Sequence, residues 1–223
     1  MKIFNTIFTV LLAGLIVTGC MNTNKAEKGD KDNKEQKVVE HPDLTVYELN
    51  GNVKNVKWYF NNFGVKELGF AISFDENGMA TKHWYDEVWE EDVDVTVKRD
   101  SQNRISEYSI TIDGEGLEYL KSEYAYDNTG MVTSISSVWY NEITTEETIS
   151  YGNDKRRTKS VSQAVSKDGE TRETIIYEYT VSDSYGNWTE RKGFKTIEEN
   201  DGTGFVIIEE GTLIEKREIE YYR

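Results

Sequence analysis

Carboxylates are the commonest groups in this sequence that could do chemistry, and they crowd most closely in one short stretch. Residues 86–94 contain six of them, at Asp86, Glu87, Glu90, Glu91, Asp92 and Asp94. A pair of carboxylates can hydrolyse a glycosidic bond when one acts as general acid and the other as base or nucleophile. Nothing in the spacing singles out two of these six, and a solvated acidic hairpin tip is the alternative interpretation. We therefore predict no catalytic residue.

Several carboxylates close together can also bind calcium, and two stretches could do so, residues 86–94 and residues 198–202. Neither stretch follows the order of an EF-hand loop, in which oxygen ligands alternate and a glutamate ends the loop. Zinc is a poor fit, because the only two histidines, His41 and His83, stand far apart in the sequence. We predict no metal site and no cofactor, since the sequence has no Gly-rich phosphate loop or nucleophile elbow.

Two tryptophans flank the acidic stretch and make it the best candidate for ligand binding. Trp84 and Trp89, with Glu90 and Glu91, could hold a neutral sugar by ring stacking and hydrogen bonds, or a cationic segment of a partner protein. The sequence contains 5 Trp and 14 Tyr, so the alternative is that these rings form cross-strand ladders inside a sheet. Both interpretations remain open from the sequence.

The net charge argues against one class of partner. At pH 7 the formal charge is −15, and the densest basic run, residues 155–157, lies beside a turn. Nucleic-acid binding needs a basic patch to neutralise phosphates. We therefore predict no nucleic-acid partner.

The first twenty residues differ in composition from the rest of the chain. Lys2 gives a positive start, and residues 3–17 are mostly apolar, which suits an export signal better than a membrane-spanning helix. The stretch ends in Val17-Thr-Gly-Cys20, which resembles the lipobox of bacterial lipoproteins. That resemblance implies that residues 1–19 are a cleaved signal peptide and that lipidated Cys20 anchors the protein in the membrane. Met21, in place of the aspartate that favours inner-membrane retention, favours the outer membrane, on its periplasmic or extracellular face.

The composition divides the remaining chain into a tether and a domain. Lysines and acidic residues alternate through residues 20–43 with almost no apolar residue before Val38, which predicts a disordered charged tether ending near Pro42. Residues 44–223 are then the folded domain. Cys20 is the only cysteine, so this domain has no disulfide and no thiol nucleophile.

Turn signals recur through the domain, separated by alternating segments of about eight to eleven residues. Ile175, Tyr177, Tyr179 and Val181 fall on one face of such a segment, and Glu178 falls on the other. A period of two with one apolar face is typical of half-buried antiparallel strands. Because twist accumulates in long open sheets, we predict an all-β antiparallel meander of about 12–14 strands, curled into a barrel-like or spiral sheet.

The turn at residues 127–130 predicts how these strands are joined. Asp127 can accept a hydrogen bond from the backbone two residues on, and Gly130 can adopt a positive φ without a Cβ clash. Related turns begin at Asp75, Asp100 and Asp183.

Tyr124-x-Tyr126-Asp127-x-x-Gly130 resembles the YD repeat of Rhs-type proteins. In that family long arrays of such hairpins spiral into a shell around a toxin. The resemblance implies β-hairpin repeats here, and the domain is too short for encapsulation.

These patterns together predict an outer-membrane or cell-surface lipoprotein with a non-catalytic β-repeat domain that binds or scaffolds a glycan or protein ligand. The alternative is an exported hydrolase that acts on glycans through a carboxylate pair. Turnover of a glycoside that one carboxylate substitution abolishes would favour the hydrolase.

Overall fold

The computed structural model describes residues 41–62, 65–85, 93–112, 117–140 and 142–223. Within these ranges the chain forms twelve strands and one short helix, which confirms the predicted all-β fold. The helix α2 spans Pro42–Val46. The strands are β1 (Val53–Asn62), β2 (Val65–Phe74), β3 (Ala80–Tyr85), β4 (Val93–Arg99), β5 (Ile105–Ile112), β6 (Leu117–Tyr126), β7 (Val132–Trp139), β8 (Ile143–Tyr151), β9 (Arg157–Ser166), β10 (Gly169–Ser182), β11 (Trp188–Asn200) and β12 (Phe205–Tyr221).

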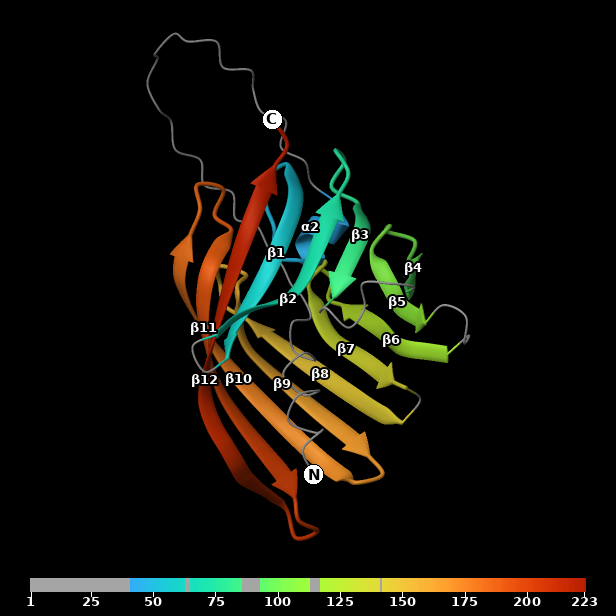
Figure 1. The fold of residues 1–223 in the computed structure, drawn as a ribbon, viewed down its shortest axis with the longest axis vertical. Helices are drawn as coiled ribbons and strands as arrows, with labels where there is room; N and C mark the ends of the chain where they lie inside the picture. The colour runs from blue at the N-terminus through green and yellow to red at the C-terminus, as the bar shows by residue number, and fades with distance from the viewer. Residues whose placement is uncertain (1–40, 63–64, 86–92, 113–116, 141) are drawn as a thin grey trace.

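All twelve strands belong to one antiparallel sheet (Figure 1). Strands adjacent in the chain are paired, except that β3 and β4 are not paired with each other in the described residues, and β1 pairs with β12 instead. The spatial order is therefore β3-β2-β1-β12-β11-β10-β9-β8-β7-β6-β5-β4. The predicted meander is confirmed. The sheet curls but does not close into a barrel, and β3 and β4 are its two edges.

The alternation along β10 decides which of its side chains face the inside of the curl, called the inner face below. Glu173, Ile175 and Tyr177 are buried there, whereas Glu178 is exposed on the opposite face. Val181 was expected on the inner face but is 49% exposed. The register between β10 and β11 shifts on both sides of Val181, and such bulges turn a side chain away from its regular direction.

The turn that begins at Asp127 has the geometry that the sequence predicts. The backbone N of Gly130 donates to the carbonyl of Asp127, and Asp127 Oδ1 accepts from the backbone N of Thr129 at 2.8 Å and of Met131 at 2.9 Å. Gly130 has φ +88°. Asn103 holds the same position in its own turn with φ +62°, because asparagine tolerates the left-handed region better than most side chains.

The packed part of the chain begins before the expected domain start at residue 44. Pro42 opens α2, where its missing N–H costs nothing, and His41 Nδ1 caps the helix by accepting from the backbone N of Asp43 at 3.1 Å. Asp43 falls within the predicted tether, yet its side chain is completely buried. Leu44 and Val46 pack into the main hydrophobic core.

Aromatic rings make up much of that core. The ring centroid of Trp58 lies 4.8 Å from Phe70 and 4.8 Å from Trp188. Trp58, Trp139 and Trp188 are at most 8% exposed. The cross-strand ladder interpretation therefore describes these three tryptophans, and burying rings of this size supplies a large share of a core's free energy.

Candidate functional site

The stretch expected to form a ligand-binding hairpin lies between β3 and β4, which are not paired with each other in the described residues. Trp84 lies in edge strand β3, where its backbone pairs with Ala71 of β2, and β4 lies at the opposite edge of the sheet order. The expectation of a hairpin here is wrong, because β1 pairs with β12 and leaves β3 and β4 as edges. Trp89, Glu90 and Glu91 lie outside the described residues. Ligand binding by these four residues stays a prediction.

The second stretch considered for calcium, residues 198–202, uses its oxygens within the protein. Glu198 accepts hydrogen bonds from Arg172 Nε and Nη2 at 2.7 and 2.8 Å. Asp201 Oδ1 accepts from the backbone N of Thr203 at 2.8 Å. Among the residues that the structure describes, no three His, Cys, Asp or Glu side chains are grouped so that they could hold a metal ion.

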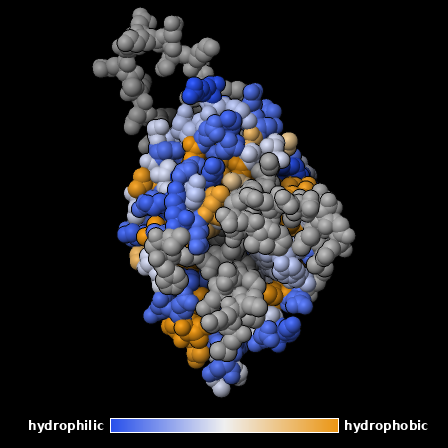
Figure 2. Space-filling view, viewed as in Figure 1, coloured by the Kyte–Doolittle hydropathy of each residue, from blue (hydrophilic) through white to orange (hydrophobic). Residues whose placement is uncertain are grey.

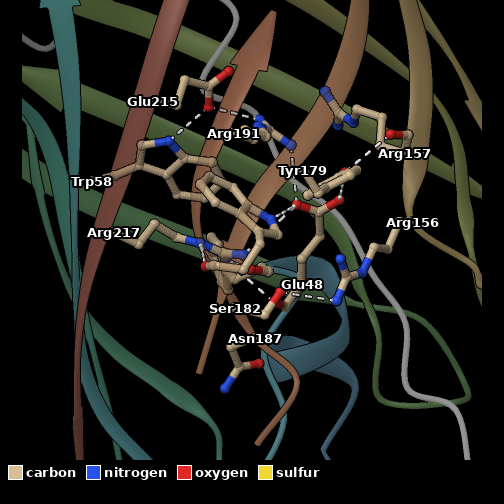
Figure 3. A network of polar contacts seen from close by, with 12 residues as sticks. Glu48, Trp58, Arg156, Arg157, Tyr179, Ser182, Asn187, Arg191, Glu215 and Arg217 are labelled. Carbon is tan, nitrogen blue, oxygen red and sulfur yellow. Dashed lines mark hydrogen bonds and ion pairs between the residues drawn. The ribbon is translucent and has the colours of Figure 1, made fainter. Parts of the chain in front are cut away.

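A cluster of buried charges and aromatic rings lies on the inner face (Figure 3). Arg191 of β11 joins two carboxylates: its Nη1 lies 3.2 Å from Glu48 Oε2, and its Nη2 lies 2.7 Å from Glu215 Oε2. Trp58 Nε1 donates to the same Glu215 oxygen at 2.8 Å, and Trp188 Nε1 donates to Glu48 Oε2. All five residues are at most 7% exposed. Together with Arg217 they are called the inner network.

Arg217 of β12 lies against two indole rings. Its guanidinium carbon is 3.5 Å from the ring centroid of Trp188 and 4.8 Å from that of Trp58. Its Nη1 donates to the carbonyl of Tyr47 at 2.8 Å, and its Nε donates to the carbonyl of Trp188 at 3.0 Å. Burial lowers the pKa of Arg217 to about 9, which leaves the group charged at pH 7. A desolvated cation over an indole gains ~2 kcal/mol or more, so the rings help to hold this charge.

Strand register assembles the inner network from segments far apart in the sequence. Trp58 pairs with Arg217 across β1 and β12, and Glu215 pairs with Arg191 across β12 and β11. Side chains directly opposite each other in antiparallel strands are close neighbours on one face. Glu48 enters from the segment after α2, where its backbone has φ +52°. Positive φ is uncommon outside glycine, and here the contacts of the carboxylate hold the residue in that conformation.

A second buried ion pair extends the cluster across β8 and β9. Arg157 Nη1 lies 3.1 Å from Glu147 Oε1, and both side chains are at most 9% exposed. Burial raises the pKa of Glu147, and the guanidinium of Arg157 opposes that rise. Burial alone would lower the pKa of Arg157, but attraction to Glu147 outweighs it and the pKa is raised. The geometry is that of an ion pair, in which each buried group is the other's partner.

Glu173 of β10 differs from the other buried carboxyl groups, because no arginine holds it. It is 2% exposed, and its Oε1 has no hydrogen-bond partner. Its neighbours in register on the inner face are Ser162 of β9 and Ile197 of β11. Burial raises the pKa of Glu173 to about 8, and the charge of Lys195 opposes the rise. At pH 7 this carboxyl group is therefore mostly protonated.

With Glu173 neutral, the charges of this buried cluster balance. It then contains three guanidinium groups and three carboxylates, those of Arg157, Arg191, Arg217, Glu48, Glu147 and Glu215. Leaving one buried charge without its counterpart costs several kcal/mol, so the balance explains how so many charges can lie inside a small domain. Among the described residues of this cluster, Glu173 is the group placed to exchange a proton near neutral pH.

From the sequence, only the tryptophans of this cluster were candidates for a buried or binding role. Arg157 was expected in a solvated loop with the basic run 155–157, and this expectation is wrong, because Arg157 is completely buried against Glu147. The sequence pattern does indicate one buried member, because Glu173 shares its strand face with Ile175 and Tyr177. A charged residue on an otherwise apolar strand face needs a buried partner or must become neutral. The partners could not be identified, because strand pairing between distant segments brings them together.

No model of a known protein family matches the chain, and no curated protein sequence matches it. Within the part of the chain that the structure describes, no helix is long and apolar enough to cross a membrane. What the domain does must therefore be inferred from its own residues and geometry.

Proposed function

We propose that the chain is an outer-membrane lipoprotein, anchored through Cys20, whose sheet domain binds or scaffolds a glycan or protein partner without catalysis. The residues Val17 to Cys20 support the anchor, through their resemblance to a lipobox. The alternating charges of residues 20–40 support a solvated tether between the anchor and the domain. The formal charge of −15 supports a partner other than nucleic acid.

The observation that carries the non-catalytic proposal is that three buried carboxylates, those of Glu48, Glu147 and Glu215, already have donors. Glu48 and Glu215 each accept from an indole N–H and from Arg191, and Glu147 is held by Arg157. A general base or nucleophile must reach the substrate with a lone pair, and these oxygens are engaged inside the domain. The same contacts fix β1, β11 and β12 against one another, which is what a rigid binding surface needs.

The anchor is tested by growing cells with a clickable fatty acid. Cys20→Ser should lose the label, because serine offers no thiolate for acyl transfer, and the neighbouring substitution Asn22→Ser should keep it. Equal labelling of wild type and Cys20→Ser would refute the anchor.

The binding surface at the segment between β3 and β4 is tested by unfolding Trp84→Ala and Trp89→Ala. A ring that contacts only a ligand costs little stability when it is removed, whereas a core ring costs ~3–5 kcal/mol. A variant as stable as wild type marks its residue for ligand screening with glycans and basic peptides. Losses of several kcal/mol in both variants would refute the binding surface at this segment.

A second candidate function rests on Glu173. A buried carboxyl group with a pKa of about 8 is protonated at neutral pH and could act as general acid. Glu147 lies on the same face, with Ser162 in register between the two. To serve as the second carboxylate of a glycan hydrolase, it would have to exchange its ion pair with Arg157 for the substrate. Turnover of chromogenic glycosides that Glu173→Gln abolishes and Glu178→Gln retains would establish this alternative.

A further inference from the structure

Strand β12 extends well beyond its partner on one side. It pairs with β11 from Phe205 onward, but with β1 only from Ile214 to Tyr221. Residues 205–213 therefore have one edge without a strand partner in the described part of the sheet. Unpaired backbone N–H and C=O groups along such an edge are a template for another strand.

The side chains on this segment make the edge unusually apolar. Val206, Ile207 and Ile208 are 45%, 59% and 55% exposed, and all residues from 206 to 212 are exposed. Apolar surface gathers over the lower ends of β11 and β12 (Figure 2). β-Branched residues on an open edge favour the addition of a strand.

The usual protections of an edge strand are few here. Natural edges are often blocked by lysine or proline, and residues 205–213 contain neither. One bulge interrupts the pairing with β11 near Ile208. Of the two acidic residues in the segment, Glu209 is drawn to its own sheet by Lys195, whose Nζ lies 2.6 Å from the carboxylate.

We propose that residues 205–209 of this edge pair antiparallel with the same residues of a second copy of this chain, about a two-fold axis at Ile207. In that register Val206 faces Ile208, and Glu209 faces Phe205. Glu210 lies just beyond the paired residues, on the side of the turn at Gly204, so neither glutamate lies opposite a charge. Like charges directly opposite each other destabilise a sheet, and an axis at Glu209 or Glu210 would create such a pair.

The chain itself is the occupant that this edge fits best. Pairing about Ile207 is self-complementary, because the apolar run lies at the axis and each acidic residue lies beyond it. The proposal does not depend on the anchor or on any ligand. The charge of −15 on each copy opposes association at long range, so salt should strengthen the dimer.

Cysteine cross-linking tests the register, because Cys20 is the only cysteine in the sequence. In the full-length Cys20→Ser background, Ile207→Cys places two thiols directly opposite each other across the axis. Opposite residues in antiparallel strands have Cα atoms ~4.5–5.5 Å apart, within the range of a disulfide. Mild oxidation should give a disulfide-linked dimer. The matched control is Ile176→Cys, which is 54% exposed on the interior strand β10 and should stay monomeric.

A mixing experiment tests the direction of pairing. Phe205→Cys and Glu209→Cys should cross-link with each other when the two variants are mixed, and each alone should cross-link poorly. Equal cross-linking of Ile207→Cys and Ile176→Cys would overturn the proposal.

Light scattering of the full-length Cys20→Ser chain in mild detergent measures the assembly directly. The protein mass should be that of two chains, and Ile207→Lys should reduce it to one, whereas Ile176→Lys should not. A single-chain mass at high salt and high protein concentration would overturn the proposal, and so would a two-chain mass for Ile207→Lys. If the edge instead takes a strand from a different protein, this chain alone would have the mass of one chain. Its mass would then rise only when that protein is added.

Discussion

Asp43 and Arg99 form a two-pronged ion pair between the segment that enters the domain and edge strand β4. Arg99 Nη1 lies 2.6 Å from Asp43 Oδ1, and Nη2 lies 2.7 Å from Oδ2. Asp43 Oδ2 also accepts from the backbone N of Ala80, in β3, at 2.8 Å. One carboxylate therefore holds both edges of the sheet, at the place where a barrel would have been closed by strand pairing.

Asp43→Asn should destabilise the domain, because the amide cannot accept both guanidinium hydrogen bonds. Asp43 is fully buried but Arg99 is about a fifth exposed, so we expect a loss of ~2–3 kcal/mol, at the lower end for breaking a buried pair. Urea unfolding measures this. Glu220→Gln, which removes an exposed pair with Lys54, is the control and should leave the midpoint nearly unchanged. Equal effects would mean that Asp43 does not join the edges.

Gly130→Val should be costly and Gly130→Asn mild. No atom lies within 4 Å of a Cβ built at this position, so the cost comes from its φ of +88° alone. A β-branched residue held in that region is strained by ~1–3 kcal/mol, and asparagine tolerates the region. Thermal unfolding of both variants checks this. Matching melting temperatures would contradict the turn geometry.

Local features of the fold could be predicted from the sequence, because each depends on a few neighbouring residues. The turn at Asp127 and Gly130 follows from side-chain hydrogen bonding and glycine's freedom. The strands follow from alternation such as that of Ile175 and Tyr177. Bulges such as the one beside Val181 interrupt the alternation without a local signal.

Long-range pairing could not be predicted in the same way. The pairing of Trp58 with Arg217 joins β1 to β12, and nothing in the sequence of either strand indicates which strand it pairs with. As long as the pairing of β1 with β12 is unknown, the sequence between β3 and β4 predicts one more hairpin. The inner network was hidden for the same reason, because Glu48, Arg191 and Glu215 meet only once the distant strands are in register.

Glu173→Gln should stabilise the domain at alkaline pH and not at acidic pH. The pKa of Glu173 is about 8 in the folded chain and 4.5 in the reference state. Between these values the folded chain keeps a proton that the unfolded chain releases, so the free energy of unfolding falls as pH rises. Glutamine resembles the protonated acid and avoids this loss.

We expect nearly equal stability of wild type and Glu173→Gln at pH 4.5, and a gain of ~2–4 kcal/mol for the variant at pH 8.5. Urea unfolding at the two pH values measures the difference. Glu178→Gln, on the exposed face of the same strand, controls for the loss of one carboxylate. A stability difference that is the same at both pH values would show that Glu173 is not buried as a neutral acid.

Glu48→Gln should be among the most destabilising of the substitutions in this domain that keep the shape of the side chain. The amide leaves the guanidinium groups of Arg191 and Arg217 with one carboxylate fewer nearby, and an uncompensated buried charge costs ~3–5 kcal/mol. Removing a positive charge as well, in Glu48→Gln with Arg191→Met, restores the balance. The double variant should therefore lose less than the sum of the two single variants, with a coupling of ~1–3 kcal/mol. A double-mutant cycle by urea unfolding measures this coupling, and additive losses would show that the inner network does not act through charge balance.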